Sequence, residues 1–199
     1  MSERATSEST ARHPTRLGGR GRGAVWIPVG VVVVIVALLA GLFAFGLGRN
    51  PTVVQPVIVG KVAPAFNLSR LDGGRTLNLS SMRGQVVVLN FWASWCADCV
   101  VENPALRSAF QRYRDQGVRF VGVSFEDQSG TARGFAKQMG MGWPLVSDPG
   151  TNTAIAYGVT GVPETFVIDP DGRIVAKTIG PVTYSVLSEQ IAHAMPGGA

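Results

Sequence analysis

Residues Asn90–Cys99, NFWASWCADC, contain the only two cysteines of this 199-residue chain, Cys96 and Cys99. An uninterrupted apolar run at residues 86–89 comes directly before this stretch, which predicts a buried parallel strand. Residues 100–116 follow with the composition of a helix. We therefore expect the two cysteines where a buried strand ends and a helix begins.

The place of the cysteines at a helix start predicts their chemistry. The first N–H groups of a helix have no partner within it, and the helix dipole favours negative charge there. A thiolate is such a charge, so we expect a lowered pKa for Cys96 and assign it as the nucleophile. Cys99 lies one helical turn further on, near enough to form a disulfide with Cys96. The spacing predicts a redox-active disulfide, Cys96–Cys99, that needs no separate cofactor.

Two other interpretations apply to the same spacing. A zinc site needs four ligands, but the chain adds only His13 in a polar tail and His193 near the C-terminus. We therefore predict no metal. A purely structural disulfide is the second interpretation, but so short a loop adds little stability through chain entropy. The strand-to-helix context favours the redox dithiol.

The stretch Phe-Trp-Ala-x-Trp-Cys-x-x-Cys at residues 91–99 resembles the active-site signature of thioredoxin-fold proteins. Pro104 matches the proline that kinks the family's active-site helix, and Val162-Pro163 matches its cis-proline. The resemblance covers roughly residues 60–195 and points to the membrane-anchored extracytoplasmic branch, which includes the ResA, TlpA and CcmG/DsbE proteins of cytochrome c maturation. It implies an α/β thioredoxin fold with an N-terminal β-hairpin extension.

The pattern of the remaining chain agrees with an α/β fold. Residues 66–70 and 75–79 predict the two strands of the hairpin, joined by a turn at 72–74. Further along we expect strands at 118–124, 165–168 and 174–179, an extended piece at 143–146, and helices at 129–140, 152–157 and 184–194. Strands and helices in this order indicate a mixed sheet with helices on both faces.

Three segments precede the thioredoxin-like domain, which we place at residues 61–196. Residues 1–23 are polar and carry five arginines against two glutamates, which predicts a disordered basic tail. Residues 24–48 contain no charged residue. As a helix they would be about 37 Å long, enough to cross a hydrocarbon core of about 30 Å, so we predict one transmembrane helix. Residues 49–60, with two prolines, are expected to be a linker.

Charge predicts the orientation of the chain and excludes one class of partner. The arginines of residues 1–23 precede the apolar segment and only Arg49 follows it closely, so the positive-inside rule places the N-terminus in the cytoplasm and the domain outside, on the cell membrane. A cleaved signal peptide is the alternative, although its apolar region usually has only about 7–15 residues. The tail supplies +3 of the net charge of +5, so the nearly neutral domain is not expected to bind nucleic acid.

A proton acceptor for Cys99 is the next requirement of the reaction. Thioredoxins usually have a buried aspartate six residues before the first cysteine, but this chain has Asn90 there, which cannot take a proton. Glu102 follows Cys99 by three residues and therefore lies on the same helix face. It resembles the glutamate of the ResA-like branch, which implies an acid–base role. The alternative is an ordinary solvated carboxylate in the first turns of a helix.

The two residues between the cysteines, Ala97 and Asp98, are expected to tune the redox couple. A carboxylate at Asp98 repels a nearby thiolate and should raise the pKa of Cys96 somewhat. It opposes the effect of the helix dipole, so we predict a reducing couple rather than a strongly oxidising one. A solvated, screened Asp98 would have no such effect.

Four residues are candidates for binding the partner protein. Pro163 is expected to follow a cis peptide bond that turns the backbone of Val162 toward the dithiol, where it can pair with an extended peptide. Glu164 comes next, in a stretch that resembles the CcmG/DsbE pattern, and either contacts a basic partner segment or is a plain surface residue. Trp95 is expected to cover one side of Cys96.

Together these features predict an extracytoplasmic, membrane-anchored thiol:disulfide oxidoreductase, acting as a reductase of protein disulfides. The resemblance implies apocytochrome c as a substrate and a membrane thiol carrier of the CcdA/DsbD type as the source of electrons. Three alternatives stay open: a DsbA-like oxidase, a thiol-dependent peroxidase, and a non-enzymatic metal carrier or binding module. The residues before Cys96 lack the Pro-x-x-x-Thr-x-x pattern of peroxiredoxins, and a distal metal-binding histidine is missing.

Overall fold

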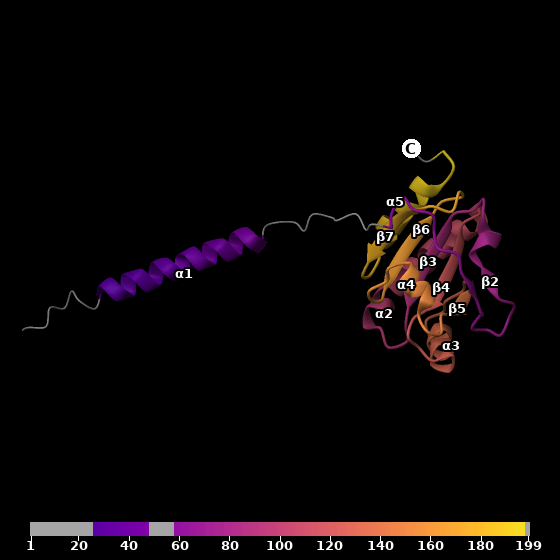
Figure 1. Ribbon diagram of the computed structural model, residues 1–199, viewed down its shortest axis with the longest axis horizontal. Coiled ribbons are helices and arrows are strands. Elements are labelled where there is room, and N and C mark those ends of the chain that lie inside the picture. Colours follow the sequence, from indigo (N-terminus) through magenta and orange to yellow (C-terminus); the bar gives the residue numbers. More distant parts are fainter. Residues whose placement is uncertain (1–25, 48–57, 198–199) are drawn as a thin grey trace, which may run out of the picture. The chain divides into compact units, whose positions relative to one another are not determined.

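The computed structural model describes residues 26–47 and 58–197 (Figure 1). The chain divides between Val54 and Gln55 into two compact units, of which the first contains helix α1 (Trp26–Leu47) and the second the domain with the cysteines. The predicted tail at 1–23 and most of the predicted linker at 49–60 lie outside the described residues. Side chains of α1 are described for residues 29–41. Across the described residues, no helix combines the length and the apolarity that crossing a membrane requires.

The domain of the second unit consists of seven strands, four α-helices and two short 3-10 helices among its described residues. In chain order these are β1 (Asn67–Leu68), β2 (Leu77–Asn78), η1 (Leu79–Met82), β3 (Val87–Trp92), α2 (Ala97–Tyr113), η2 (Arg114–Gln116), β4 (Arg119–Ser124), α3 (Ser129–Gln138), β5 (Leu145–Ser147), α4 (Asn152–Ala156), β6 (Glu164–Ile168), β7 (Ile174–Ile179) and α5 (Tyr184–Ala194).

Five of the strands form one mixed sheet in the order β5-β4-β3-β6-β7. The pairs β3–β4 and β4–β5 are parallel, whereas β3–β6 and β6–β7 are antiparallel. β3 is the central strand and every one of its residues is buried, as the apolar run at residues 86–89 predicts, and the polar Asn90 is buried with them. Because β3 ends four residues before Cys96, the cysteines follow the central strand of the sheet.

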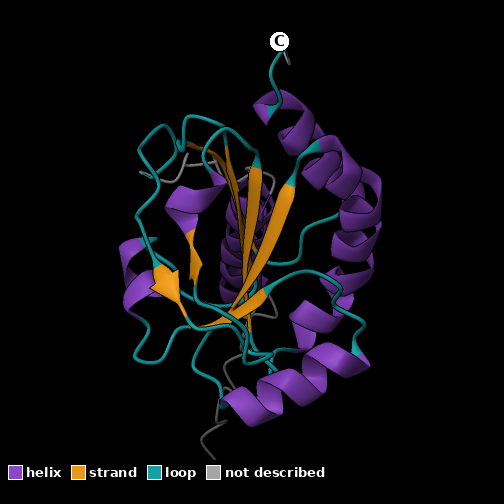
Figure 2. Ribbon diagram, turned by 90° about the vertical axis from the view of Figure 1, so that its right-hand side faces the viewer, coloured by secondary structure: helices purple, strands orange, loops and turns teal. Residues whose placement is uncertain are grey.

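Helices cover both faces of this sheet (Figure 2). On one face, α2 and α5 pack their apolar side chains against alternate residues of β3, such as Val88, and against Phe120 of β4. On the other face, Leu89 and Phe91 of β3 pack with Tyr157 at the end of α4. This is the α/β thioredoxin-like arrangement that the sequence predicts.

The predicted N-terminal hairpin is present but shorter than expected. β1 and β2 pair over two residues each, Asn67 with Asn78 and Leu68 with Leu77. Residues 69–71 leave the hairpin because they bond to β5 instead: the Leu71 amide donates to the Leu145 carbonyl and the Ser147 amide to the Ser69 carbonyl. The edge strand β5 thus bonds to part of the segment 66–70, which the sequence predicted to pair within the hairpin.

Candidate active site

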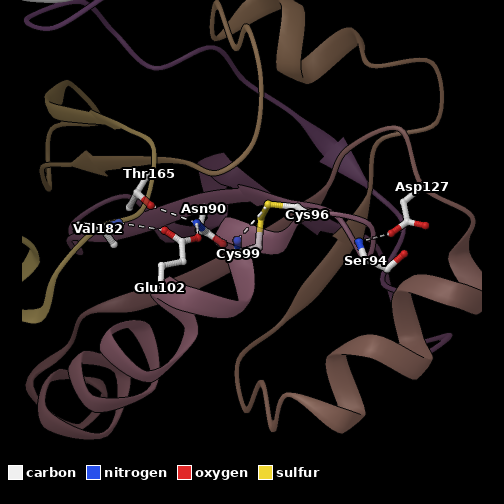
Figure 3. The surroundings of a disulfide bond; sticks show 8 residues. All are labelled: Asn90, Ser94, Cys96, Cys99, Glu102, Asp127, Thr165 and Val182. Atoms are coloured by element: carbon white, nitrogen blue, oxygen red, sulfur yellow. Dashed lines mark hydrogen bonds between the residues drawn. A yellow bond between two sulfur atoms is a disulfide. The ribbon is translucent and has the colours of Figure 1, made fainter.

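Cys96 is the N-cap residue of α2, with an extended backbone, and Cys99 lies in the first turn of that helix. The two sulfurs form a disulfide, with a Cα–Cα distance of 5.3 Å (Figure 3). The Cys99 amide donates a hydrogen bond to the Cys96 sulfur at 3.0 Å. One unpaired N–H group of the helix N-terminus is thus already directed at Cys96, the interaction that would stabilise a thiolate there.

The dithiol lies at the edge of the core rather than in open solvent. Cys96 is 5% exposed and Cys99 1% exposed, and both pack in a cluster with Trp92 of β3 and Ala132 of α3. Trp95, in contrast, is 57% exposed. Its indole N–H donates to the Glu126 carbonyl at 3.1 Å. Trp95 therefore has a solvent-facing ring that is held at its indole nitrogen, and its role as a cover over Cys96 stays a prediction.

A contact that the sequence analysis missed holds the loop ahead of Cys96. One carboxylate oxygen of Asp127 accepts a hydrogen bond from the Ser94 amide at 2.6 Å (Figure 3). Asp127 follows β4, and β4 pairs in parallel with β3, so both strands end at the same edge of the sheet. The sequence could have indicated this contact, because residues directly after two neighbouring parallel strands lie close together.

Glu102 is buried in α2, 2% exposed, and both of its carboxylate oxygens accept hydrogen bonds. The Asn90 side-chain amide donates to Oε1 at 2.8 Å, and the Val182 backbone amide donates to Oε2 at 3.2 Å (Figure 3). The same Asn90 amide nitrogen also donates to the Thr165 hydroxyl at 3.0 Å. The alternative of a solvated first-turn carboxylate is therefore wrong for Glu102.

Burial raises the pKa of Glu102 to about 7, and the negative charge of Asp98 adds to this effect. The hydrogen bonds from Asn90 and Val182 act in the opposite direction, because they stabilise the charged form. A carboxyl group with a pKa near 7 can both take and release a proton at neutral pH.

Ala97 and Asp98, the two residues between the cysteines, are both exposed on the first turn of α2.

The peptide bond between Val162 and Pro163 is cis, as predicted. Val162 is partly buried and packs against the cluster that contains the two cysteines. The backbone N–H and C=O groups of Val162 have no hydrogen-bond partner among the described residues.

The prediction that Glu164 contacts a partner segment, or is a plain surface residue, needs correction. Its side chain is 1% exposed, and it forms an ion pair with Lys177, with 2.8 Å between Oε2 and Nζ. Glu164 is the first residue of β6, next to the central strand, and its side chain points into the domain. Sequence alone did not reveal the pair, because it depends on the register between β6 and β7.

The only two cysteines of the chain form a disulfide at the start of a helix. Such a disulfide can exchange with a dithiol of another molecule, so that one pair of cysteines is reduced while the other is oxidised. The protein is a thiol:disulfide oxidoreductase with a thioredoxin-like fold, and its curated relatives carry the same activity in their names. The chain belongs to the AhpC/TSA family, whose family model matches residues 59–177.

Several similar proteins are named for disulfide exchange. The thiol:disulfide interchange protein HelX of Rhodobacter capsulatus is 36% identical over 170 residues, which cover 84% of this chain and 94% of HelX. DsbE of Allochromatium vinosum is 35% identical, covering 83% and 88%, and ResA of Bacillus cereus is 30% identical, covering 82% and 95%. A crystal structure of a putative DsbE from Chlorobium tepidum superposes with a TM-score of 0.63 at 33% identity, covering 68% of this chain and 96% of that one.

Proposed function

We propose that this protein is a membrane-anchored, extracytoplasmic reductase of protein disulfides. The observation that carries the proposal is the Cys99 amide directed at the Cys96 sulfur at the start of α2, with the buried Glu102 one turn further along the same helix. The arrangement provides a nucleophile, a resolving thiol and a proton acceptor.

Cys96 performs the first step in the reduced protein. Its thiolate attacks one sulfur of the partner's disulfide, so a mixed disulfide forms and the other partner sulfur leaves as a thiolate and takes up a proton. The helix N-terminus favours the reactive ionised form of Cys96. One S–S bond replaces another in this step, so the step needs no external oxidant or reductant.

Cys99 performs the second step and must lose its proton first. Glu102 accepts that proton, and the Cys99 thiolate then attacks the Cys96 sulfur, which releases the second partner sulfur. The protein ends with the Cys96–Cys99 disulfide seen in the structure, and the partner holds two thiols. Two electrons and two protons have passed from the dithiol to the partner.

The backbone of Val162 is the proposed binding site for the partner's main chain. It lies beside the dithiol and has no hydrogen bond to the described part of the chain. An extended peptide that pairs with Val162 would bring its own disulfide toward Cys96. The exposed Trp95 ring would form one side of this surface.

The direction and the partners are the finer parts of the proposal. Asp98 is exposed on the first turn of α2, where solvent screens its charge, so the reducing direction is supported by the resemblance to the reductase branch and not by Asp98. The resemblance to the ResA and DsbE proteins supports the haem-binding cysteine pair of apocytochrome c as the substrate. A membrane thiol carrier of the CcdA/DsbD type would return the dithiol to its reduced form.

Anchoring in the membrane is supported by the sequence. The uncharged stretch at residues 24–48 has the length of a membrane span, and the arginines on its N-terminal side favour a cytoplasmic N-terminus. Full-length protein should remain in the membrane after a carbonate wash. Its domain should be open to protease added to the outside of intact spheroplasts, and protection of the domain would contradict the orientation.

The main test is to trap the mixed disulfide with Cys99→Ser. An oxidised peptide containing Cys-x-x-Cys-His should accumulate on Cys96 of this variant, whereas the matched control Cys96→Ser/Cys99→Ser should capture none. A variant that captures no peptide while Cys96 still reacts with iodoacetamide would contradict a protein substrate. A measured potential near the roughly −120 mV of strong oxidants would favour the oxidase alternative instead.

Two further measurements separate the remaining alternatives. Consumption of hydrogen peroxide by Cys99→Ser that depends on Cys96 would favour a peroxidase. Metal that copurifies in stoichiometric amount and blocks Cys96 alkylation would favour a metal carrier.

A further inference from the structure

Lys177 is a buried cation in the middle of β7, opposite Phe166 of β6. Its side chain is only 5% exposed. The Lys177 Nζ lies 2.8 Å from Glu164 Oε2, donates to the Gly158 carbonyl at 2.8 Å, and sits 5.1 Å from the centre of the Phe166 ring. A buried ammonium group needs such partners, because an unpaired one is strongly disfavoured.

Glu164 extends these contacts to the loop that precedes it. Its Oε1 accepts two hydrogen bonds from Thr160, from the backbone amide at 3.0 Å and from the hydroxyl at 3.1 Å. The segment 158–164 is thus held at its start by Lys177, through Gly158, and further along by Glu164, through Thr160. The ion pair joins these two attachments.

This segment carries Val162 and Pro163, and its other hydrogen bonds lie at its two ends. The Gly158 amide donates to the Ile155 carbonyl and the Val159 amide to the Ala154 carbonyl, and the Pro163 carbonyl accepts from the Gly180 amide. Within the described part of the chain, residues 160–162 form no hydrogen bond except those from Thr160 to Glu164. Glycines at positions 158 and 161 leave the backbone free to change conformation. Between these ends, the packing of the Val162 side chain and the bonds from Thr160 to Glu164 are what hold the loop, so the ion pair contributes to the position of Val162.

We propose that Lys177 and Glu164 are positioning residues, a buried ion pair that fixes the cis-proline loop so that the Val162 backbone is ready to pair with the partner's chain. The inference rests on the proposed function, since it assigns a role in binding a peptide partner. Without Lys177 the Glu164 carboxylate would be buried without a countercharge, which favours conformations in which Glu164 and the loop bonded to it through Thr160 move toward solvent.

A purely structural ion pair would lower stability without a selective effect on partner binding. The kinetics separate the two cases, because a loss of ground-state binding raises KM and leaves kcat unchanged. The chemical reactivity of reduced Cys96 toward iodoacetamide reports separately on the dithiol.

The experiment compares the full-length protein with three variants on an oxidised peptide that contains Cys-x-x-Cys. Lys177→Met removes the cation with little change in side-chain volume, and we expect KM to rise about tenfold. Lys177→Met/Glu164→Gln removes both charges, retains an acceptor for Thr160, and should show a smaller rise of about threefold. Thr178→Val is the matched control, because Thr178 is the next residue of β7 and its hydroxyl bonds to Gln190 instead. Its KM should match that of the unmodified protein.

Hydrogen exchange of the Thr160 amide gives a readout that does not depend on activity. In Lys177→Met this amide should exchange at least about tenfold faster than in Thr178→Val. A KM for Lys177→Met that equals the control value, with Thr160 still protected, would overturn the inference. If Lys177→Met does not fold, the charge-neutral double variant decides, and a KM equal to the control again overturns it.

Failure of the proposed function has a different signature. In that case the unmodified protein would not reduce the peptide, although its Cys96 reacts with iodoacetamide, and a role in binding would be refuted for all variants. A protein that reduces the peptide equally well with and without Lys177 would refute only the inference about the ion pair.

Discussion

The side-chain amide of Asn90 donates a hydrogen bond to the carboxylate of Glu102, with 2.8 Å between Nδ2 and Oε1. Asn90 occupies the place where thioredoxins usually have an aspartate, and Glu102 lies 12 residues later in α2. The two residues have separate roles, because Glu102 can change its charge whereas Asn90 always offers a donor to the charged form. This separation makes the titration of Glu102 the first property to test.

Glu102→Gln should change how stability depends on pH. The pKa of Glu102 is about 7 in the folded protein, compared with 4.5 for an unperturbed glutamate. The folded state therefore holds more protons than the unfolded state between these values, and stability falls as pH rises through this window, by about 3 kcal/mol in total. The variant cannot titrate there, so its stability relative to the unmodified protein should increase by about this amount from pH 4 to pH 8.

Urea unfolding of the oxidised protein at several pH values measures this difference, since the disulfide keeps the cysteines from titrating. Glu189→Gln, an exposed carboxylate of α5, is the matched control. A difference between Glu102→Gln and the unmodified protein that stays constant from pH 4 to pH 8 would contradict the raised pKa.

Asn90→Leu should shift the pH dependence of the second chemical step. The variant lacks the donor that stabilises the charged carboxylate, so the pKa of Glu102 should rise further. The acid limb of the kcat–pH profile for peptide reduction should move toward alkaline pH by the same amount. Thr165→Val is the control, because it removes the other partner of Asn90 but keeps the bond to Glu102, and its profile should move less. Equal shifts in both variants would argue against a direct effect of Asn90.

The sequence predicted the centre of this site well because its signals are local. A buried strand followed by Cys-x-x-Cys places Cys96 at a helix N-terminus, and the i+3 spacing places Glu102 on the face of Cys99. The cis bond before Pro163 was available from the resemblance alone. Apart from that cis bond, these features depend on residues close together in the chain.

The missed features depend on contacts between distant segments. The buried pair of Glu164 and Lys177 requires the register of β6 against β7, which periodicity does not specify. The bond from Ser94 to Asp127 requires that two strand ends meet across 33 residues. Glu102 is buried where the backbone of Val182, 80 residues later in the chain, bonds to its carboxylate. No local pattern carries this information.

Gly122→Ala should destabilise the sheet beside the cysteine cluster. A Cβ atom on this residue of β4 would lie 2.6 Å from Leu145 Cδ2 and 2.8 Å from the indole nitrogen of the fully buried Trp92. Because Trp92 cannot move without disturbing the core, the cost should be about 1–3 kcal/mol. Gly134→Ala in α3 is the control: a Cβ there meets nothing within 4 Å, and helix propensity predicts a gain of about 0.5–1 kcal/mol. Thermal unfolding of both variants checks the opposite signs, and a neutral Gly122→Ala would refute the close approach.

Asp127→Ala should loosen the loop that leads into Cys96. The variant removes the charged acceptor of the Ser94 amide, whose hydrogen bond of 2.6 Å joins the end of β3 to the end of β4. A hydrogen bond to a charged group contributes about 1.5–3 kcal/mol when buried, and the partial exposure of Ser94 places the expected loss near the lower value. Hydrogen exchange of the Ser94 amide should accelerate, while the Cys99 amide, bonded to the Cys96 sulfur, reports on whether the helix start is disturbed as well. Asp127→Asn retains a neutral acceptor and should keep most of the protection at Ser94. If Ser94 exchanges equally fast in the unmodified protein and in Asp127→Ala, the carboxylate does not hold this loop.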